Sequence, residues 1–495
     1  MSEEVLPPTA ARAAGVPAPR PSAAGEQFGQ GLAQKSMGPV EVLAQSVAAI
    51  APSAVMATGP ALIVLSAGSG TWLSYLFATV MVLLIGYCVA QFATRIASAG
   101  SLYSYVASSI GATPAFAAGW GLVVGYTMIA IVGVAGFGIY GGSLLEGMGI
   151  PATSTGALVA LFLVAALAAV AFAAYGIKLS TRVGLVLEIF SVAALLILFA
   201  VVLAQNGLSL DTAQLRAEGS TLDGVTFGMV LAVLGFVGFE SAASLGAEAK
   251  DPHRAIPRAV LAAGLIVGVM YVVATYASIA GLGVEGLGSS AAPMNDLAED
   301  AGIGGFRFVI DVGVAASFFA VAIASVNAAA RVLYTMARER VLPDALGRTH
   351  PRHRTPHVAI LALLPVLALL PITMVLLGRS ALDVYAYTGT IGTFGYMTAY
   401  LLMAVGMPVF LAARGERRAV HVVVAALACA ALVYVVFKNL VPAPPSPFDV
   451  LPYLYAGVLA LGLGWFLVLR VRHPERARLV GTYDEETPPV PDRRA

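Results

Sequence analysis

Twelve long apolar stretches follow one another along the chain, separated by short segments that hold most of the charged residues. Each stretch reaches the roughly 20 apolar residues that a helix needs to cross a hydrocarbon core of about 30 Å. None shows the regular alternation of apolar and polar positions that is typical of a transmembrane β-barrel. We therefore predict an all-α membrane protein with twelve transmembrane helices, at residues 40–66, 72–95, 114–144, 154–176, 181–205, 224–246, 257–281, 306–336, 357–377, 382–412, 419–438 and 449–470.

Positively charged residues are distributed unevenly between the two sides of this predicted bundle. If the N-terminus lies in the cytoplasm, all but four of the 28 Lys and Arg residues fall in cytoplasmic segments. The four on the outer side are Arg216, Arg307, Arg379 and Lys438. Because membrane proteins retain positive residues on the cytoplasmic side, we expect a multi-pass protein of the cytoplasmic membrane with both termini inside. Residues 1–37 and 472–495 are expected to form cytoplasmic tails, the first of them disordered.

The composition agrees with a membrane location and argues against other classes of protein. Apolar residues make up 59% of the 495 residues and charged residues 11%, whereas soluble domains carry about 25% charged residues. The net charge of +1 gives no reason to expect a nucleic acid partner. Cys88 and Cys429 lie inside apolar stretches, so no disulfide or metal site is expected. Nucleotide-binding, zinc-protease and serine-hydrolase motifs do not occur, so we expect no enzyme and no cofactor.

Two of the predicted helices contain residues that interrupt helical hydrogen bonding near the middle of the span. The first contains Pro52 and Pro60, and neither can donate the amide hydrogen that a helix requires. The sixth contains Gly235 and Gly238, followed by Glu240, and glycine weakens a helix. Pro and Gly are frequent in membrane helices, so one interruption alone would carry little weight. Two interruptions at corresponding positions are typical of a transporter binding site.

The two interruptions lie five helices apart, and this spacing predicts an inverted repeat. Because five is odd, two copies of a five-helix unit would enter the membrane in opposite directions. We expect the first unit at residues 38–205, the second at 224–412, and two additional helices at 413–471. A carrier with two parallel six-helix halves is the alternative fold.

The interrupted helices suggest a zwitterionic ligand at the middle of the membrane. Free amide groups at the start of each second half-helix would bind a carboxylate, and free carbonyl groups at the end of each first half-helix would bind an ammonium group. The predicted substrate contacts are Ser53, Ala54, Val55, Met56, Gly235, Phe236, Val237, Gly238 and Phe239. Phe236 and Phe239 would either close over the substrate or pack in the core. Apolar residues around Val55, Leu234 and Val237 favour a neutral amino acid.

Two acidic residues lie inside predicted helices, and an ionisable residue within a membrane helix is a candidate for function. Glu240, at the second interruption, is our candidate for proton coupling. The alternative is that Glu240 only caps the half-helix that follows it. Glu188, in the fifth helix, is either a second relay carboxylate or a packed hydrogen-bonding residue.

Three segments match the pattern of a known family of carriers. They are Gly238–Ala242 with the following Glu248–Ala259, Ser98–Tyr105 after the second helix, and Asn327–Tyr334 in the eighth. These residues resemble the amino acid–polyamine–organocation permeases, and the likeness covers about residues 38–475. The resemblance implies a leucine-transporter-type fold with the substrate held between helices 1, 3, 6, 8 and 10.

The same resemblance places further residues at the substrate. They are Tyr126 and Ala130 of the third helix and Tyr385 and Thr388 of the tenth. Some proton-driven members carry a lysine midway along the fifth helix, where this chain has Ser191. The coupling ion, whether H⁺ or Na⁺, and the choice between ion coupling and exchange are therefore left open by the resemblance.

The sequence thus predicts a secondary active transporter that moves an amino acid or a related amine by alternating access, coupled to protons or operating as an exchanger. Its partners would be the small-molecule substrate, the lipid bilayer and H⁺. One alternative is a polyamine or other organic-amine carrier of the same fold. Another is a membrane sensor that binds the substrate without transporting it.

Overall fold

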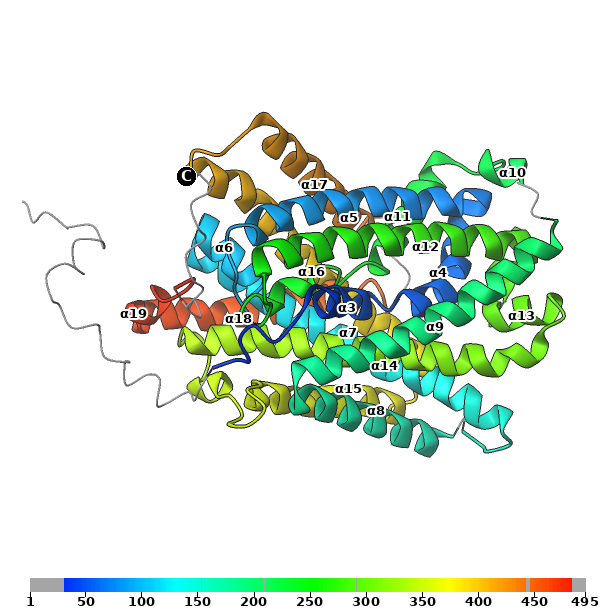
Figure 1. The fold of residues 1–495 in the computed structure, drawn as a ribbon, viewed down its shortest axis with the longest axis horizontal. Coiled ribbons are helices and arrows are strands. Elements are labelled where there is room, and N and C mark those ends of the chain that lie inside the picture. Colours follow the sequence, from blue (N-terminus) through cyan, green and yellow to red (C-terminus); the bar gives the residue numbers. More distant parts are fainter. Residues whose placement is uncertain (1–30, 153, 208–210, 291, 442–445, 483–495) are drawn as a thin grey trace, which may run out of the picture.

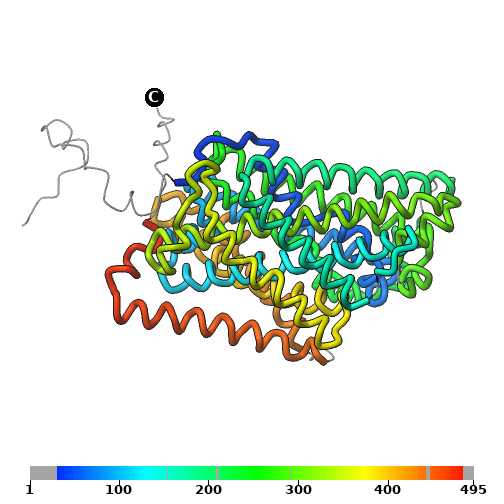
Figure 2. Tube along the Cα trace, turned by 90° about the horizontal axis from the view of Figure 1, so that it is seen from below, coloured from blue at the N-terminus to red at the C-terminus, as the bar shows by residue number. Residues whose placement is uncertain are grey.

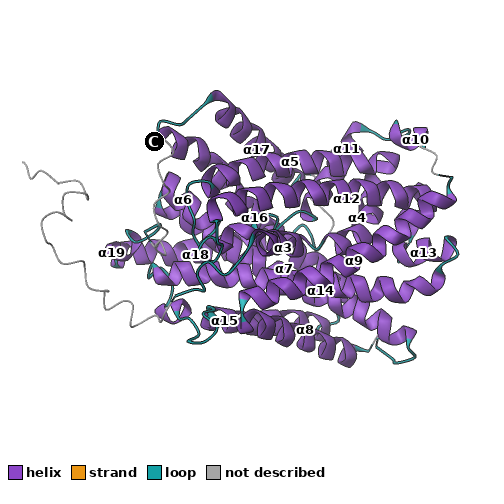
Figure 3. Cartoon of the chain, in the orientation of Figure 1, coloured by secondary structure: helices purple, strands orange, loops and turns teal. Residues whose placement is uncertain are grey.

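Helices make up most of the structure (Figures 1 and 3). The computed structural model describes residues 31–152, 154–207, 211–290, 292–441 and 446–482. Within these residues, the β structure is limited to one isolated bridge between Met37 and Ala249. The prediction of an all-α protein is therefore confirmed for the described part of the chain.

The long helices run roughly side by side, with α10 and α13 at one end of the bundle and α6 and α19 at the other (Figure 1). The helices are α3 (Pro39–Ile50), α4 (Pro52–Ala67), α5 (Thr71–Ala93), α6 (Leu102–Ile110), α7 (Ala112–Gly147), α8 (Thr155–Tyr175), α9 (Ile177–Gln205), α10 (Thr212–Leu215), α11 (Leu222–Leu234), α12 (Pro252–Ser289), α13 (Pro293–Asp300), α14 (Arg307–Arg338), α15 (His357–Leu376), α16 (Ala381–Ala413), α17 (Ala419–Lys438), α18 (Leu451–Arg472) and α19 (Pro474–Ala477). Short 3-10 helices lie at Gly68–Gly70, Ser241–Leu245, Gly304–Phe306 and Asp344–Gly347.

Ten helical segments of the described chain are long and apolar enough to cross a membrane. The first of them, Pro39–Ala93, contains α3, α4 and α5. Helix α11 is apolar but has only 13 residues, so by itself it is shorter than a span. Each of the twelve predicted stretches overlaps at least one α-helix of the structure. The length criterion nevertheless identifies ten spans, and the count of twelve stays a prediction.

Helices α7 and α14 form the centre of the bundle. Within the most apolar part of each, 83% and 78% of the residues are buried, compared with 22% in α18. Helix α18 runs along the side of the bundle (Figure 2), and its Leu461 is 76% exposed. A side chain this apolar and this exposed belongs in lipid. Helix α7 also packs closely on α16, since a Cβ at Gly395 would lie 2.4 Å from the carbonyl oxygen of Gly121. Small residues permit such close helix packing in membranes.

The first interruption lies at Ala51, between α3 and α4. Ala51 adopts a left-handed conformation with φ of 53°, and Pro52 is the first residue of α4. A proline disfavours helical geometry in the residue before it, which explains why the chain breaks at Ala51. Pro60 stays inside α4 without ending it.

The second interruption follows α11 and differs from the expected half-helix. Residues 235–240 form turns, and the segment after them is a 3-10 helix, Ser241–Leu245, instead of an α-helix. Gly238 has φ of 93°, and a Cβ there would lie 2.9 Å from the carbonyl oxygen of Ala49. Because Gly238 has no side chain, its backbone can pack directly on Ala49, and the two interruptions are in contact. The Ala242 amide donates to Ser46 Oγ at 3.2 Å and joins the same two segments.

The ends of the described chain pack on the bundle. Leu32 and Met37 were predicted to lie in a disordered tail, but they are 1% and 0% exposed. Near the other end, the Gly481 amide donates to Glu339 Oε1 at 2.9 Å. The remainder of the two predicted tails lies outside the described residues.

Candidate functional site

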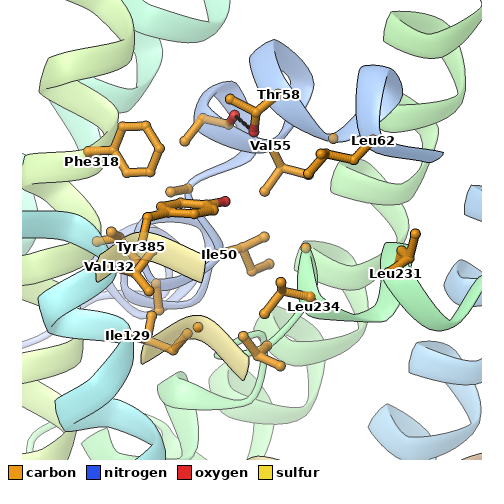
Figure 4. A pocket seen from close by; sticks show the side chains of 18 of the residues that line it. Ile50, Val55, Thr58, Leu62, Ile129, Val132, Leu231, Leu234, Phe318 and Tyr385 are labelled. Carbon is orange, nitrogen blue, oxygen red and sulfur yellow. Dashed lines mark hydrogen bonds between the residues drawn. The ribbon is translucent and has the colours of Figure 1, made fainter. Parts of the chain in front are cut away.

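An apolar cavity of about 100 Å³ lies where the two interruptions meet. Figure 4 shows Val55, Leu234 and Tyr385 converging on it from α4, α11 and α16. Its lining comes from seven helices and the turn after α11, and consists of Ala49, Ile50, Ala51, Ala54, Val55, Thr58, Gly59, Leu62, Ile63, Tyr75, Ile129, Val132, Leu231, Leu234, Gly235, Val237, Phe318, Val321, Tyr385 and Gly389. No charged side chain is among these described residues. The cavity therefore suits an uncharged, largely apolar group.

Five of the predicted substrate contacts line this cavity. They are Ala54, Val55, Gly235, Val237 and Tyr385. The other predicted contacts are buried nearby but are not part of the lining: Ser53, Met56, Tyr126, Ala130, Phe236, Gly238, Phe239 and Thr388. Their proposed contacts with substrate stay predictions.

Several backbone groups at the first interruption differ in whether they have a hydrogen-bond partner. Among the first amides of α4, Pro52 has no hydrogen, Ser53 donates to Glu188 Oε1, and Val55 donates to the carbonyl of Ala51. We find no acceptor for the Ala54 amide among the described residues. On the other side of the break, Ala49 and Ile50 end α3 and line the cavity. The residue with the unpaired amide and the last residues of α3 thus line one cavity, and unpaired groups at helix ends are the kind that bind a carboxylate or an ammonium group.

Glu240 lies in a fully buried cluster of hydroxyl groups. Tyr126 donates to its Oε1 at 2.7 Å, and Tyr400 donates to its Oε2. Tyr400 also accepts a hydrogen bond from the Gly238 amide at 3.4 Å. Tyr126, which the resemblance placed at the substrate, holds this carboxylate instead of lining the cavity. All the partners are neutral, so Glu240 has no compensating positive charge, which a buried ionised group ordinarily requires.

Glu188 caps the start of α4 and does not line the cavity. Its Oε1 accepts from the Ser53 amide at 3.1 Å and from Ser53 Oγ at 2.5 Å, and its Oε2 accepts from Ser317 Oγ at 2.7 Å. The glutamate is 2% exposed. These contacts match the packed hydrogen-bonding role that was one of the two alternatives, and they link α4, α9 and α14.

The predicted gating residues pack against tyrosine rings in this structure. The Phe236 ring lies 5.0 Å from Tyr271 and the Phe239 ring 5.6 Å from Tyr400, both in edge-to-face contact. Thr388 Oγ1 donates to the carbonyl of Val384 at 2.7 Å, within its own helix. In this structure the two phenylalanine rings pack in the core, and the Thr388 hydroxyl is hydrogen-bonded within its own helix.

A buried ion pair lies toward the end of the bundle that carries α6 and α19. Arg331 Nε and Nη2 contact the two oxygens of Glu248 at 2.5 and 3.0 Å, and both side chains are at most 1% exposed. Met37 pairs with the backbone beside Glu248, since its amide donates to the Glu248 carbonyl and its carbonyl accepts from the Lys250 amide. This pair was missed by the sequence analysis, although Arg331 falls within the predicted helix 306–336, a position that could have indicated a buried partner.

Much of the cavity wall was missed by sequence reasoning. Tyr75 of α5, Ile129 and Val132 of α7, and Phe318 of α14 come from helices with no interruption. Nothing distinguishes them in sequence from the other apolar residues that face the core. Tyr75 also has a fully buried hydroxyl without a hydrogen-bond partner.

Comparisons with known proteins identify the family of the chain and several relatives. The family model described as "Amino acid permease" matches residues 41–467. A branched-chain amino acid permease of Bacillus subtilis is 28% identical over 307 residues, which cover 59% of this chain and 65% of that permease. An uncharacterized transporter of Mycobacterium tuberculosis is 29% identical over 83% of this chain and 87% of its own length. A methylthioribose transporter of Bacillus subtilis is 26% identical over 61% of this chain and 65% of its own length.

Proposed function

The chain belongs to the amino acid permease family, and on that basis we propose that it is a secondary active transporter that carries a neutral amino acid across the cytoplasmic membrane by alternating access. The observation that carries this proposal is the uncharged cavity beside the free Ala54 amide at the Ala51 break. A helix terminus recognises the backbone groups of any amino acid, and the apolar lining selects a neutral side chain. The name of the branched-chain permease among its relatives supports the same substrate class.

A polyamine carrier is less consistent with the cavity. Polyamines carry several positive charges and need carboxylates, but no acidic side chain lines the described cavity. A sensor that binds an amino acid without moving it has the same binding site. Flux of the substrate into vesicles that contain the purified protein separates a transporter from a sensor.

We also propose twelve transmembrane helices in two inverted five-helix units, 38–205 and 224–412, followed by α17 and α18. Two observations support this architecture. The interruptions at Ala51 and Gly238 occupy the first helix of each unit, and they contact each other through Ala49. Helix α11 and the 3-10 helix after it would together form the sixth span, in which the interruption exposes backbone groups to the substrate.

The proposed orientation places the Glu248–Arg331 ion pair on the cytoplasmic side, and cysteine labelling tests it. Ser289 ends α12 and Ala345 follows α14, and both are exposed. In a protein without Cys88 and Cys429, a membrane-impermeant thiol reagent added outside cells is expected to label S289C but not A345C. Labelling of A345C after the membrane is opened serves as the control. Labelling of both positions from outside would refute the orientation.

Substrate binding is expected to be lost when Ala54 is replaced by leucine. Ala54 is 2% exposed and lines the cavity, so a larger side chain would fill the space beside its amide. Titration of purified protein with leucine, followed by thermal shift, measures the loss. A160L is the matched control, because Ala160 of α8 is exposed and an added side chain there would face lipid.

The same titration with leucinamide examines the carboxylate contact. The amide derivative keeps the ammonium group and side chain but has no negative charge to place at the amide of Ala54. We expect it to bind the unmodified protein much more weakly than leucine. Equal binding of leucine and leucinamide would show that the start of α4 does not bind the carboxylate.

A further inference from the structure

The hydroxyl of Tyr75 is an unused polar group in the wall of the substrate cavity. Tyr75 is 0% exposed, and its hydroxyl has no hydrogen-bond partner among the described residues. Its ring is held in place by Tyr271, at 5.1 Å between ring centroids. A buried hydroxyl without a partner destabilises a folded protein, and because Tyr75 lines the cavity, its hydroxyl is available to a polar group of the ligand.

The position of this hydroxyl is defined by α4. A Cβ added to Gly59 would lie 2.1 Å from the Tyr75 hydroxyl oxygen, and both residues line the cavity. The absence of a side chain at Gly59 therefore makes room for the hydroxyl itself, which packs against the backbone of α4. Gly59 follows Ala54 by five residues, a distance of about 7.5 Å along a helix that rises about 1.5 Å per residue.

The cavity follows this same length of α4, because Ala54, Val55, Thr58 and Gly59 all line it. A substrate whose carboxylate binds the Ala54 amide would direct its side chain toward Gly59. Side chains as short as valine or threonine would end before the tyrosine. A side chain as long as that of glutamine would bring its last polar atom to the hydroxyl.

We propose that Tyr75 is a specificity-determining residue, which hydrogen-bonds the polar end of a neutral side chain of about the length of glutamine. The inference rests on the proposed amino acid transport and narrows its substrate class. Apart from Tyr75, the side-chain hydroxyls of the lining belong to Thr58 and Tyr385, and Thr58 Oγ1 already donates to the Ala54 carbonyl at 2.9 Å. An aliphatic side chain of equal length still fits but leaves the Tyr75 hydroxyl without a partner. The site thus favours an amide or hydroxyl at the end of the side chain.

Pairs of amino acids with the same shape test this proposal. Threonine and valine, asparagine and leucine, and glutamine and homoleucine differ within each pair only in polar groups. We expect Tyr75→Phe to lower the affinity for glutamine relative to homoleucine by about five- to tenfold, which corresponds to one neutral hydrogen bond. The ratio of threonine to valine should not change. Dissociation constants come from thermal-shift titration of the purified full-length protein.

Two further variants identify the cause of any change. Tyr105 is also fully buried with an unpartnered hydroxyl but does not line the cavity, so Tyr105→Phe should leave every ratio unchanged. Gly59→Ala should displace the Tyr75 hydroxyl and reduce the preference for glutamine as Tyr75→Phe does. Because Tyr75→Phe removes an unsatisfied group, its melting temperature without substrate should equal or exceed that of the unmodified protein.

Two outcomes would overturn the proposal. One is an unchanged ratio of glutamine to homoleucine in Tyr75→Phe, and the other is an equal loss of affinity for all six amino acids. Failure of the proposed transport function is distinguishable from both, because then none of the six would bind the unmodified protein.

Discussion

Replacing Arg331 by methionine is expected to destabilise the protein by about 3–5 kcal/mol, the cost of leaving one member of a buried ion pair without its partner. Arg331 and Glu248 are 1% and 0% exposed at their side chains, so water cannot solvate the glutamate that remains. The guanidinium also donates from Nη1 to the Asn327 carbonyl at 2.8 Å. Thermal unfolding of the purified variant in detergent measures the effect as a lower melting temperature.

Two variants separate the loss of the ion pair from loss of packing. Arg331→Met combined with Glu248→Leu removes both charges, and it should recover most of the lost stability because apolar residues replace the pair. Arg182→Met is the exposed control, since Arg182 pairs with Glu41 but its side chain is 59% exposed. Its effect should stay within about 1 kcal/mol. Equal destabilisation by Arg331→Met and Arg182→Met would contradict the prediction.

The helical fold was predictable because each apolar stretch carries its own signal. A stretch such as 357–377 needs no information about its neighbours to be recognised as a helix, and the structure has α15 at His357–Leu376. Of the two prolines named for the first interruption, Pro52 does mark it, since it acts on Ala51 immediately before it, whereas Pro60 lies inside α4. The second interruption was harder to describe. Gly235 and Gly238 indicate that the helix is weakened there, but they do not indicate that a 3-10 helix follows.

The site was less predictable because its contacts join distant parts of the chain. Glu240 is a candidate because of its residue type and location, and its role stays a prediction, but its partners Tyr126 and Tyr400 are 114 and 160 residues away and were not predicted as such. Glu188 and Ser53 are separated by 135 residues. With one sequence, no local pattern connects such pairs. Tyr75 illustrates the same limit, because only the packed structure reveals that its hydroxyl has no partner.

Replacing Glu240 by glutamine is expected to abolish proton-driven accumulation of substrate while leaving substrate exchange intact. Glutamine has nearly the volume of a protonated glutamate, and its oxygen can still accept a hydrogen bond from Tyr126 or Tyr400, which hold Glu240 now. The turn that holds Gly238 and the cavity should therefore keep their shape, and the variant should still bind substrate. Glutamine cannot release a proton, so a pH gradient can no longer drive uptake. Purified protein in vesicles, with and without an imposed pH gradient, measures accumulation and exchange separately.

Glu188→Gln provides the matched comparison, because Glu188 is also a buried carboxylate that accepts hydrogen bonds from neutral donors, Ser53 and Ser317. If Glu240 carries the coupled proton, Glu188→Gln should retain gradient-driven accumulation, with a lower melting temperature from the weakened cap on α4. Accumulation retained by Glu240→Gln and lost in Glu188→Gln would assign the coupled proton to Glu188 instead. Full accumulation by both variants would exclude proton coupling through either residue and favour exchange.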